Sequence, residues 1–249
     1  MSETSVERAF AILETFGKEQ RPLSLKELAE YCRMPASTCH SLVHTLLKRS
    51  YLYQTGKRKN VYPTRRIYDL GATIVAHDQI LQRLDPVMED LRDSTRETVI
   101  LGKRQGDEVV YLEVLESPEV IRYSARPGDT KPLASTCIGK AMLAELGHDE
   151  AKQWLQNNPP RRATPNTITS VKSLLADLTK GRDAGFYMTH GENVADVTAL
   201  AVPFRLNNEQ LAIAVAGPSH RIDANLSKIA GLLRKTQSSL LEQEHYEHV

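Results

Sequence analysis

The stretch SLKELAEYCRMPASTCHSLVHTLLKRSYL, residues 24–52, decides how the first third of this chain folds. Ser24 followed three residues later by Glu27 is the capping-box pattern of a helix N-terminus. Residues 31–34 predict a tight turn, and Pro35 suits the first position of a second helix, where its missing N–H is not needed. Two short helices joined in this way within about 25 residues are typical of a helix-turn-helix.

The second of these helices has two chemically different faces. One face is apolar and contains Cys39, Leu42, Val43, Leu46 and Leu47. The other carries hydroxyl and imidazole groups in place of the usual Glu and Lys, namely Ser37, Thr38, His40, Ser41, His44 and Thr45. Short side chains let a helix approach the major groove closely, and these groups can hydrogen-bond base edges.

We therefore predict a DNA-reading helix with base contacts from Ser37, Thr38, His40, Ser41 and His44. Two alternatives stay open. A polar helix face beside a basic loop is also an ordinary solvated surface, and His44 is equally well explained as a bystander.

The flanking sequence extends the pattern to a winged helix-turn-helix. Apolar residues at helical spacing over residues 6–16 predict a first helix, which Gly17 should end. Residues 51–53 and 61–62 predict two short strands around the loop 54–60. Phosphate contacts that set register are expected from the basic residues Lys48, Arg49, Lys57, Arg58 and Lys59.

The distribution of charge agrees with a DNA-binding head. The chain has 249 residues with 32 Lys and Arg against 31 Asp and Glu. Residues 1–66 contain 12 Lys and Arg against 6 Asp and Glu, whereas the remainder contains 20 against 25. Only the N-terminal part is therefore expected to meet a polyanion. We predict a DNA-binding domain over residues 4–66, a linker helix over 67–80 and a second domain over 81–249.

Other classes of protein are disfavoured by the sequence. Three widely spaced cysteines form neither a disulfide framework nor a zinc site. No signal pattern and no apolar run near ~20 residues is present, so we expect a cytoplasmic protein without membrane contact. Neither a metal nor another cofactor is expected.

Residues 67–249 predict an α+β arrangement. After the linker helix, a helical pattern over 81–91 is interrupted at Asp85-Pro86. Strands are expected at 98–101 and 109–112 around a loop at 102–107, and further strands at 120–125, 186–188, 200–204 and 211–216. Helices are expected at 135–146, 151–156, 171–182 and 224–243. Helices that bracket an antiparallel set of strands are typical of α+β domains.

The motifs SVERAFAILETF (residues 5–16), residues 24–52 and KPLASTCIGKAML (residues 131–143) resemble the IclR family of bacterial transcription regulators. The third matches that family's P-L-x-x-x-x-x-G-K-A signature. The resemblance implies a winged helix-turn-helix, a linker helix and a GAF-like effector domain. It also implies a homodimer or dimer of dimers on double-stranded DNA with a pseudo-palindromic operator. The family commonly has Arg where this chain has Ser41, so base preferences do not carry over.

The linker helix and its neighbours help to pair subunits in that family. The alternative is that the helix packs on its own body.

The signature has a physical meaning of its own. Ser135 or Thr136 can cap the following helix, and the free N–H groups of its first turn favour a carboxylate. The Gly139-Lys140 pair does not form a P-loop, because Ala134 stands where Gly is required and Ala141 where Ser or Thr is required. A nucleotide phosphate is therefore not the expected ligand.

Family members that sense small 2-oxo acids line their pocket with Asp, Cys and two Ser. The matching positions here are Thr189, Ala199, Ala214 and Ala216, and this loss of polar groups disfavours a small oxo acid. We expect a larger, partly apolar organic acid, a class that includes aromatic acids. Its carboxylate should contact the backbone of residues 137–139. The expected ligand-binding residues are Thr136, Cys137, Ile138, Gly139, Thr189, Ala199, Ala214 and Ala216. Alternatively, the alanines are ordinary strand residues beneath a helix.

An enzyme is the less favoured class. Cys137 near a helix N-terminus could be a nucleophile or a redox or electrophile sensor. No spacing joins it to His148 or His190, and no hydrolase or metalloprotease motif is present. We therefore expect a regulator rather than a catalyst.

Overall fold

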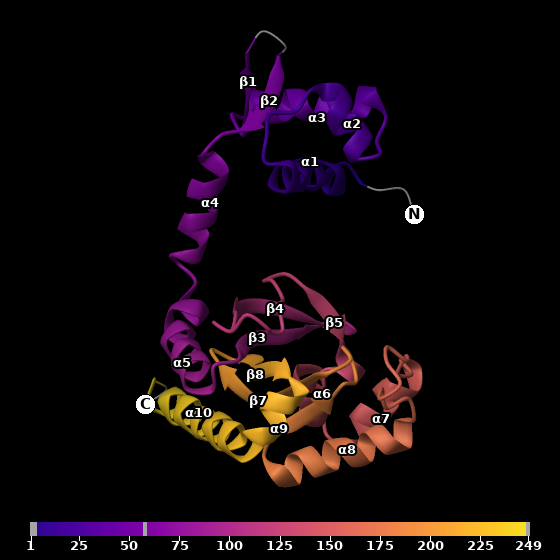
Figure 1. Cartoon of the computed structure of the whole chain (residues 1–249), viewed down its shortest axis with the longest axis vertical. Coiled ribbons are helices and arrows are strands. Elements are labelled where there is room, and N and C mark those ends of the chain that lie inside the picture. Colours follow the sequence, from indigo (N-terminus) through magenta and orange to yellow (C-terminus); the bar gives the residue numbers. More distant parts are fainter. Residues whose placement is uncertain (1–3, 57–58, 248–249) are drawn as a thin grey trace. The chain divides into compact units, whose positions relative to one another are not determined.

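The computed structural model describes residues 4–56 and 59–247, which form two units, Met1–Asp78 and Gln79–Val249 (Figure 1). We call them the head and the body. As predicted, the head is a helix-turn-helix with a two-stranded wing, and the body combines a sheet with helices.

The head begins with α1 (Ser5–Glu19), which is capped by Thr4 and Glu7 in a capping box. The prediction that Gly17 ends this helix was wrong. The helix continues for two further residues and stops at Gln20, which is left-handed with φ 52° and donates its N–H to the carbonyl of Phe16. Ile12 and Phe16, buried on one face, hold the last turns in place.

The next two helices are α2 (Leu25–Tyr31) and α3 (Ala36–Lys48). Ser24 and Glu27 form the expected capping box. The turn closes because Arg33 adopts a left-handed conformation with φ 48° and the N–H of Met34 donates to the carbonyl of Ala29. Pro35 was predicted to be the first helical residue but is the N-cap of α3, so the helix begins one residue later, at Ala36.

The wing consists of β1 (Leu52–Thr55) and β2 (Asn60–Pro63), which pair antiparallel. Val61 of β2 also exchanges backbone hydrogen bonds with Leu23, so the wing is tied to the start of the helix-turn-helix. One apolar core joins helices and wing, and it includes Ile12, Phe16, Leu23, Leu28, Cys39, Val43, Leu52 and Val61. Cys39 is therefore a core residue, as expected.

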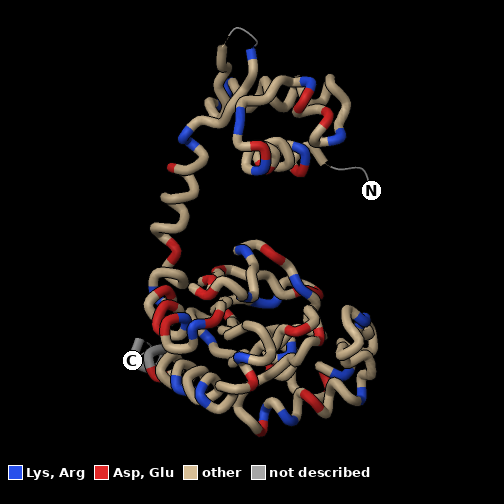
Figure 2. Tube along the Cα trace, in the orientation of Figure 1, with Lys and Arg blue, Asp and Glu red and all other residues tan. Residues whose placement is uncertain are grey.

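After the wing comes α4 (Arg66–Val75), where the linker helix was predicted. None of its residues is buried, and Tyr68 and Ile74 are 66% and 62% exposed. Figure 2 shows few charged residues along this helix.

The body contains a six-stranded antiparallel sheet in the order β5-β4-β3-β8-β7-β6. The strands are β3 (Thr98–Gln105), β4 (Glu108–Leu115), β5 (Thr130–Pro132), β6 (Tyr187–His190), β7 (Val197–Leu206) and β8 (Glu209–Pro218). The helices are α5 (Gln79–Thr95), α6 (Cys137–Glu145), α7 (His148–Asn157), α8 (Val171–Ala184), α9 (Ser219–Ala224) and α10 (Leu226–Glu247), with a 3-10 turn at Leu133–Ser135.

Successive side chains along a strand point to opposite faces of the sheet. In this sheet, large and small residues alternate, so one face carries large side chains and the other carries small ones. Large residues such as Leu200, Val202 and Ile213 pack with residues of α5 and α10. Small residues such as Ala199 and Ala214 lie on the other face, in the core that contains α6. Small side chains allow α6 to approach the sheet closely.

Three sequence predictions for the body need correction. Helix α5 runs through Pro86 without a break, because burial of Leu84 and Met88 on one face holds both halves. Gly102 belongs to β3, at a shift in the pairing register, and a side chain there would press on the carbonyl of Val110. Residues 120–125 are not a strand.

Side-chain contacts replace strand pairing in that segment. Glu116 accepts hydrogen bonds from Arg122 and Ser124, and Thr98 donates to the carbonyl of Tyr123. The strand that does pair with β4 is the short β5. The helix predicted over residues 224–243 is α10, which begins at Leu226, and the short α9 before it was not predicted.

Candidate functional site

The first candidate site is the outer face of α3. Five of the predicted contact residues there are exposed, namely Ser37, His40, Ser41, His44 and Lys48, and Thr38 is half-buried. The opposite face holds Cys39 and Val43 in the core. The hydroxyl of Thr45 donates to the carbonyl of Ser41, so this hydroxyl is used within the helix. The face therefore offers short polar side chains that suit a major groove.

The wing follows this helix closely in sequence. Gly56 and Lys59 both have left-handed backbone angles, with φ of 61° and 51°, as the loop turns between β1 and β2. Lys59 is exposed at the start of the returning strand. Lys57 and Arg58, the other two predicted phosphate contacts of the wing, lie outside the described residues.

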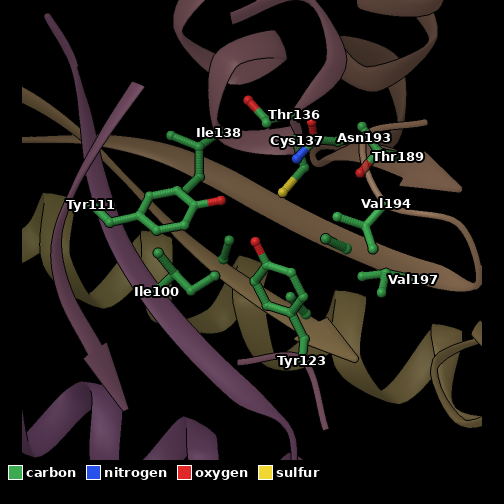
Figure 3. A pocket seen from close by; sticks show the side chains of 13 residues that line it. Ile100, Tyr111, Tyr123, Thr136, Cys137, Ile138, Thr189, Asn193, Val194 and Val197 are labelled. Atoms are coloured by element: carbon green, nitrogen blue, oxygen red, sulfur yellow. The ribbon is translucent and has the colours of Figure 1, made fainter. Parts of the chain in front are cut away.

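The second candidate site is a cavity between α6 and the sheet of the body (Figure 3). Seven of the eight predicted ligand-binding residues line it: Thr136, Cys137, Ile138, Thr189, Ala199, Ala214 and Ala216. They meet because Thr189 pairs with Ala199 and Ala199 pairs with Ala216 across three neighbouring strands. Its free volume is about 30 Å³, and a water needs about 10–15 Å³ of such space.

The eighth residue, Gly139, is not among the residues that line the cavity. Its N–H donates to the hydroxyl of Thr136, 3.1 Å away, so it is not free for a carboxylate. A Cβ at this position would lie 2.1 Å from the carbonyl oxygen of Leu133. Glycine is therefore needed for close packing of the helix against the preceding turn.

The start of α6 still offers two donors. Thr136 is the N-cap, and the first backbone bond of the helix runs from Lys140 to the carbonyl of Thr136. The N–H groups of Cys137 and Ile138 precede that bond, so the helix itself supplies no acceptor for them. Both residues line the cavity, and such an end attracts negative charge.

Six lining residues were not predicted from sequence: Ile100, Tyr111, Tyr123, Asn193, Val194 and Val197. They come from strands and loops whose register or conformation the sequence does not specify. Figure 3 shows the hydroxyls of Tyr111 and Tyr123 and the sulfur of Cys137 directed toward the same space. No Lys, Arg or His is among the described residues that line the cavity.

The two tyrosines are neutral hydrogen-bonding groups. Burial raises the pKa of Tyr111 far above its usual range, and its hydrogen bond with Tyr123 raises it further. Burial also raises the pKa of Tyr123, whereas the hydrogen bond from Tyr111 acts in the opposite direction. The pair thus forms a polar spot in a largely apolar cavity.

The environment of Cys137 disfavours the thiolate, whereas reactive cysteines have a lowered pKa. Burial raises its pKa to about 12, and the N–H groups at the start of the helix and the charge of Lys140 offset this only in part. A protonated thiol is a poor nucleophile. This disfavours the alternatives of a nucleophilic or redox-sensing Cys137.

A buried charged cluster lies beside the cavity and was also missed. The Nζ of Lys140 lies 2.6 Å from a carboxylate oxygen of Asp177, 2.6 Å from one of Glu192 and 3.0 Å from the carbonyl of Met188. Lys140 is the lysine of the Gly-Lys pair. The sequence gives no signal of its burial, because lysine is usually exposed and the packing of Gly139 is visible only in the structure.

The described residues contain no group of three His, Cys, Asp or Glu side chains placed to hold a metal ion. None of their helices combines the length and apolarity needed to span a membrane.

Comparison with known proteins gives matches over almost the whole chain. Residues 5–56 match a family model described as the IclR helix-turn-helix domain, and residues 72–241 match one described as bacterial transcriptional regulator IclR C-terminal. The regulator KdgR of Escherichia coli is 32% identical over 218 residues, which is 88% of this chain and 81% of KdgR. The regulator XynR of the same organism is 30% identical over 84% of this chain and 83% of XynR.

Solved structures show the same fold. The IclR protein of Thermotoga maritima superimposes with a TM-score of 0.81 at 24% identity, covering 96% of this chain and 98% of that one. An IclR homolog of Microbacterium hydrocarbonoxydans, solved in complex with 4-hydroxybenzoate, gives a TM-score of 0.76 at 23% identity and covers 98% of this chain and all of that one.

Proposed function

The chain belongs to the IclR family and is a DNA-binding transcriptional regulator, and from this premise we propose that a small, partly apolar carboxylate controls its DNA binding. The observation that carries the proposal is the chemical division of the body cavity. The first N–H groups of α6, which have no acceptor within the helix and lie near the Cys137 thiol, are at one part of it, and alanine, valine and isoleucine side chains form most of the remainder.

An aromatic acid fits this division better than a 2-oxo acid. Ala199, Ala214 and Ala216 cannot hydrogen-bond a keto oxygen or a second hydroxyl, and an unpaired buried oxygen costs about 1–3 kcal/mol. An aromatic ring needs no such partner. The structural neighbour from Microbacterium hydrocarbonoxydans, which binds 4-hydroxybenzoate, supports this ligand class.

The proposed binding mode uses groups already in place. The carboxylate accepts hydrogen bonds from the N–H groups of Cys137 and Ile138, whose helix end also favours negative charge. The ring lies against the alanine wall. The hydroxyls of Tyr111 and Tyr123 are the partners for a polar substituent on the ring.

On the DNA side, we propose that α3 enters the major groove. Ser37, Thr38, His40 and Ser41 lie in its first turns and would contact bases, whereas Lys48 and the basic wing would contact phosphates. Two heads of a homodimer would read the two halves of an approximate palindrome.

The exposed apolar residues of α4 support self-association. Tyr68, Leu70, Ile74 and Val75 are each about half exposed or more, as contact residues of a second subunit would be before pairing. Ligand binding in the body would then shift the population of head arrangements in the dimer.

Isothermal titration calorimetry with four acids tests the ligand proposal. We expect 4-hydroxybenzoate and benzoate to bind, and pyruvate and glyoxylate to give no heat of binding. Tyr111→Phe should weaken 4-hydroxybenzoate by about 1 kcal/mol, or fivefold, and leave benzoate unchanged, because only the former has a hydroxyl to pair. Binding of pyruvate or glyoxylate without either benzoate would overturn the proposed ligand class.

A further inference from the structure

Burying the charged groups around Lys140 costs desolvation free energy, so stability alone does not explain this cluster. Lys140 and Glu192 have side chains only 1% and 8% exposed, and the cluster contains one lysine and two carboxylates. The second carboxylate oxygen of Glu192 is buried and has no hydrogen-bond partner among the described residues. Burial raises the pKa of Glu192, although Lys140 acts against this. Well-packed apolar residues often stabilise a core as well as such a cluster does.

What the cluster connects explains its position. Lys140 lies on α6, and Asp177 lies on α8. Glu192 is the second residue after β6, and the next residues along the chain, Asn193, Val194 and Val197, line the cavity. We call residues 191–197 the wall segment. The ion pair between Lys140 and Glu192 thus connects α6 to the wall segment of the cavity.

Other contacts close the wall segment into a short loop. Thr164 and Thr167 donate hydrogen bonds to the carbonyls of Gly191 and Glu192. The N–H of Gly191 donates to the carbonyl of Val197, 2.8 Å away. Residues 194–196 between these ties are exposed, so the middle of the wall segment is the part of the lining with the least packing around it.

The size of the cavity requires a wall to move. About 30 Å³ of free volume holds two or three waters by the measure of about 10–15 Å³ each, far less than a benzene ring needs. Apart from Tyr123, which is half-buried and whose carbonyl is tied to Thr98, the other walls belong to α6 and to the sheet, where Cys137, Ile138, Ala199 and Ala214 are buried. Displacing them would disrupt the core.

We propose that Lys140, through Glu192, is a positioning residue that holds the wall segment closed and so controls access to the cavity. Its biological meaning rests on the cavity being the ligand site proposed above. Opening breaks the Lys140–Glu192 contact and exposes the space around Cys137, while α6 stays bound to α8 through Asp177.

Alkylation of Cys137 measures this opening without any ligand, so it succeeds or fails independently of the proposed function. The intact protein is treated with iodoacetamide, and labelling of Cys137 is followed by peptide mass spectrometry. Glu192→Ala removes the contact to the wall segment. Asp177→Ala is the matched control, because it removes a carboxylate at the same 2.6 Å distance from Lys140 but from α8.

We expect Glu192→Ala to raise the Cys137 labelling rate about tenfold or more, with little dependence on added urea, as in local opening. Without urea, Asp177→Ala should change the Cys137 labelling rate less than about threefold, and larger changes should appear only when urea unfolds the whole protein. A third variant, Glu97→Ala, breaks the buried pair between Glu97 and Arg221, which does not line the cavity, and gives the effect of general destabilisation.

Equal labelling of the Glu192→Ala and Asp177→Ala proteins would overturn the proposal. The same holds for a Glu192→Ala rate that rises only with a steep urea dependence, because global unfolding would then explain it. If Glu192→Ala lowers the yield of folded protein, Lys140→Met provides the second variant, and the same labelling criterion applies to it.

Discussion

At the level of single residues, Gly139 shows what sequence reasoning can and cannot supply. The motif correctly places a helix N-terminus with a threonine cap at Thr136. The Thr136 cap also accounts for the hydrogen bond from the Gly139 N–H, because a cap hydroxyl accepts from the N–H three residues further on. The motif does not reveal that the backbone of Leu133 lies against the Cα of Gly139, since that contact depends on the 3-10 turn before the helix.

Gly139→Ala should therefore destabilise the body. The added Cβ would lie 2.1 Å from a backbone oxygen that cannot rotate away, so we expect a loss of about 1–3 kcal/mol or more in the free energy of unfolding. Trp154, the single tryptophan of the chain, lies in the body and reports its urea unfolding by fluorescence. Gly231→Ala in α10 is the control, because nothing lies within 4 Å of its added Cβ, and it should gain up to about 1 kcal/mol.

A second residue-level prediction concerns Cys137 and alkaline pH. Its pKa is raised from 9.0 to about 12 in the folded protein, so the neutral thiol stabilises the fold fully below pH 9. Between about pH 9 and pH 12 the unfolded chain ionises and the folded one does not, and up to about 1.4 kcal/mol per pH unit is lost.

The Cys137→Ser protein has no thiol to ionise, so its free energy of unfolding should not show this loss above pH 9. Urea unfolding of both proteins at a series of pH values should show the stability advantage of the wild type shrinking above pH 9. An advantage that stays constant to pH 11 would mean that the thiol is not buried as described.

At the level of elements, most helices and strands could be predicted because their apolar residues have regular spacing. The errors share a cause. Gly17, Pro86 and Gly102 are local signals for breaks, yet burial of Phe16, Leu84 and Leu101 keeps each element continuous. Residues 120–125 have strand-like composition, but Val120 and Ile121 are exposed and the segment is held by side-chain contacts instead.

Helix α3 and the wing lead to a prediction about DNA binding. Replacing Lys57, Arg58 and Lys59 by Ala should weaken all DNA sequences about equally and reduce the slope of log affinity against log salt by about 3, one unit per phosphate contact. His40→Ala should instead change sequence preference, by about 1–3 kcal/mol at one base pair. Fluorescence anisotropy at several salt concentrations separates the two effects, and an unchanged salt slope in the triple variant would contradict the docking of the wing.

At the level of the whole molecule, the division into a basic N-terminal part and an acidic remainder could be read from charge alone, and two units are present in the structure. The cavity could be predicted only in part. Sequence matches placed Thr189, Ala199 and Ala216, which lie in register on neighbouring strands. Tyr111, Tyr123 and the wall segment join them only because the sheet folds over α6.

Subunit pairing is tested on α4. Introducing charge with Leu70→Glu and Ile74→Glu together should weaken self-association about tenfold or more, because a buried unpaired carboxylate is strongly unfavourable. Thr73→Glu, on the polar side of the same helix where the Thr73 hydroxyl donates to the carbonyl of Asp69, is the matched control. Sedimentation velocity over a concentration range measures the effect, and equal dimerisation of both variants would show that α4 does not pair subunits.

The most direct test is a titration of the full-length protein onto the DNA upstream of its own gene, with and without 4-hydroxybenzoate, at physiological ionic strength. We expect specific binding at least about a thousandfold tighter than to random duplex. We also expect the acid to change this affinity, and the change to be lost in Ala214→Val, whose extra methyl groups fill the cavity. Equal affinity for both DNAs, or an acid response that is unchanged in Ala214→Val, would contradict these expectations.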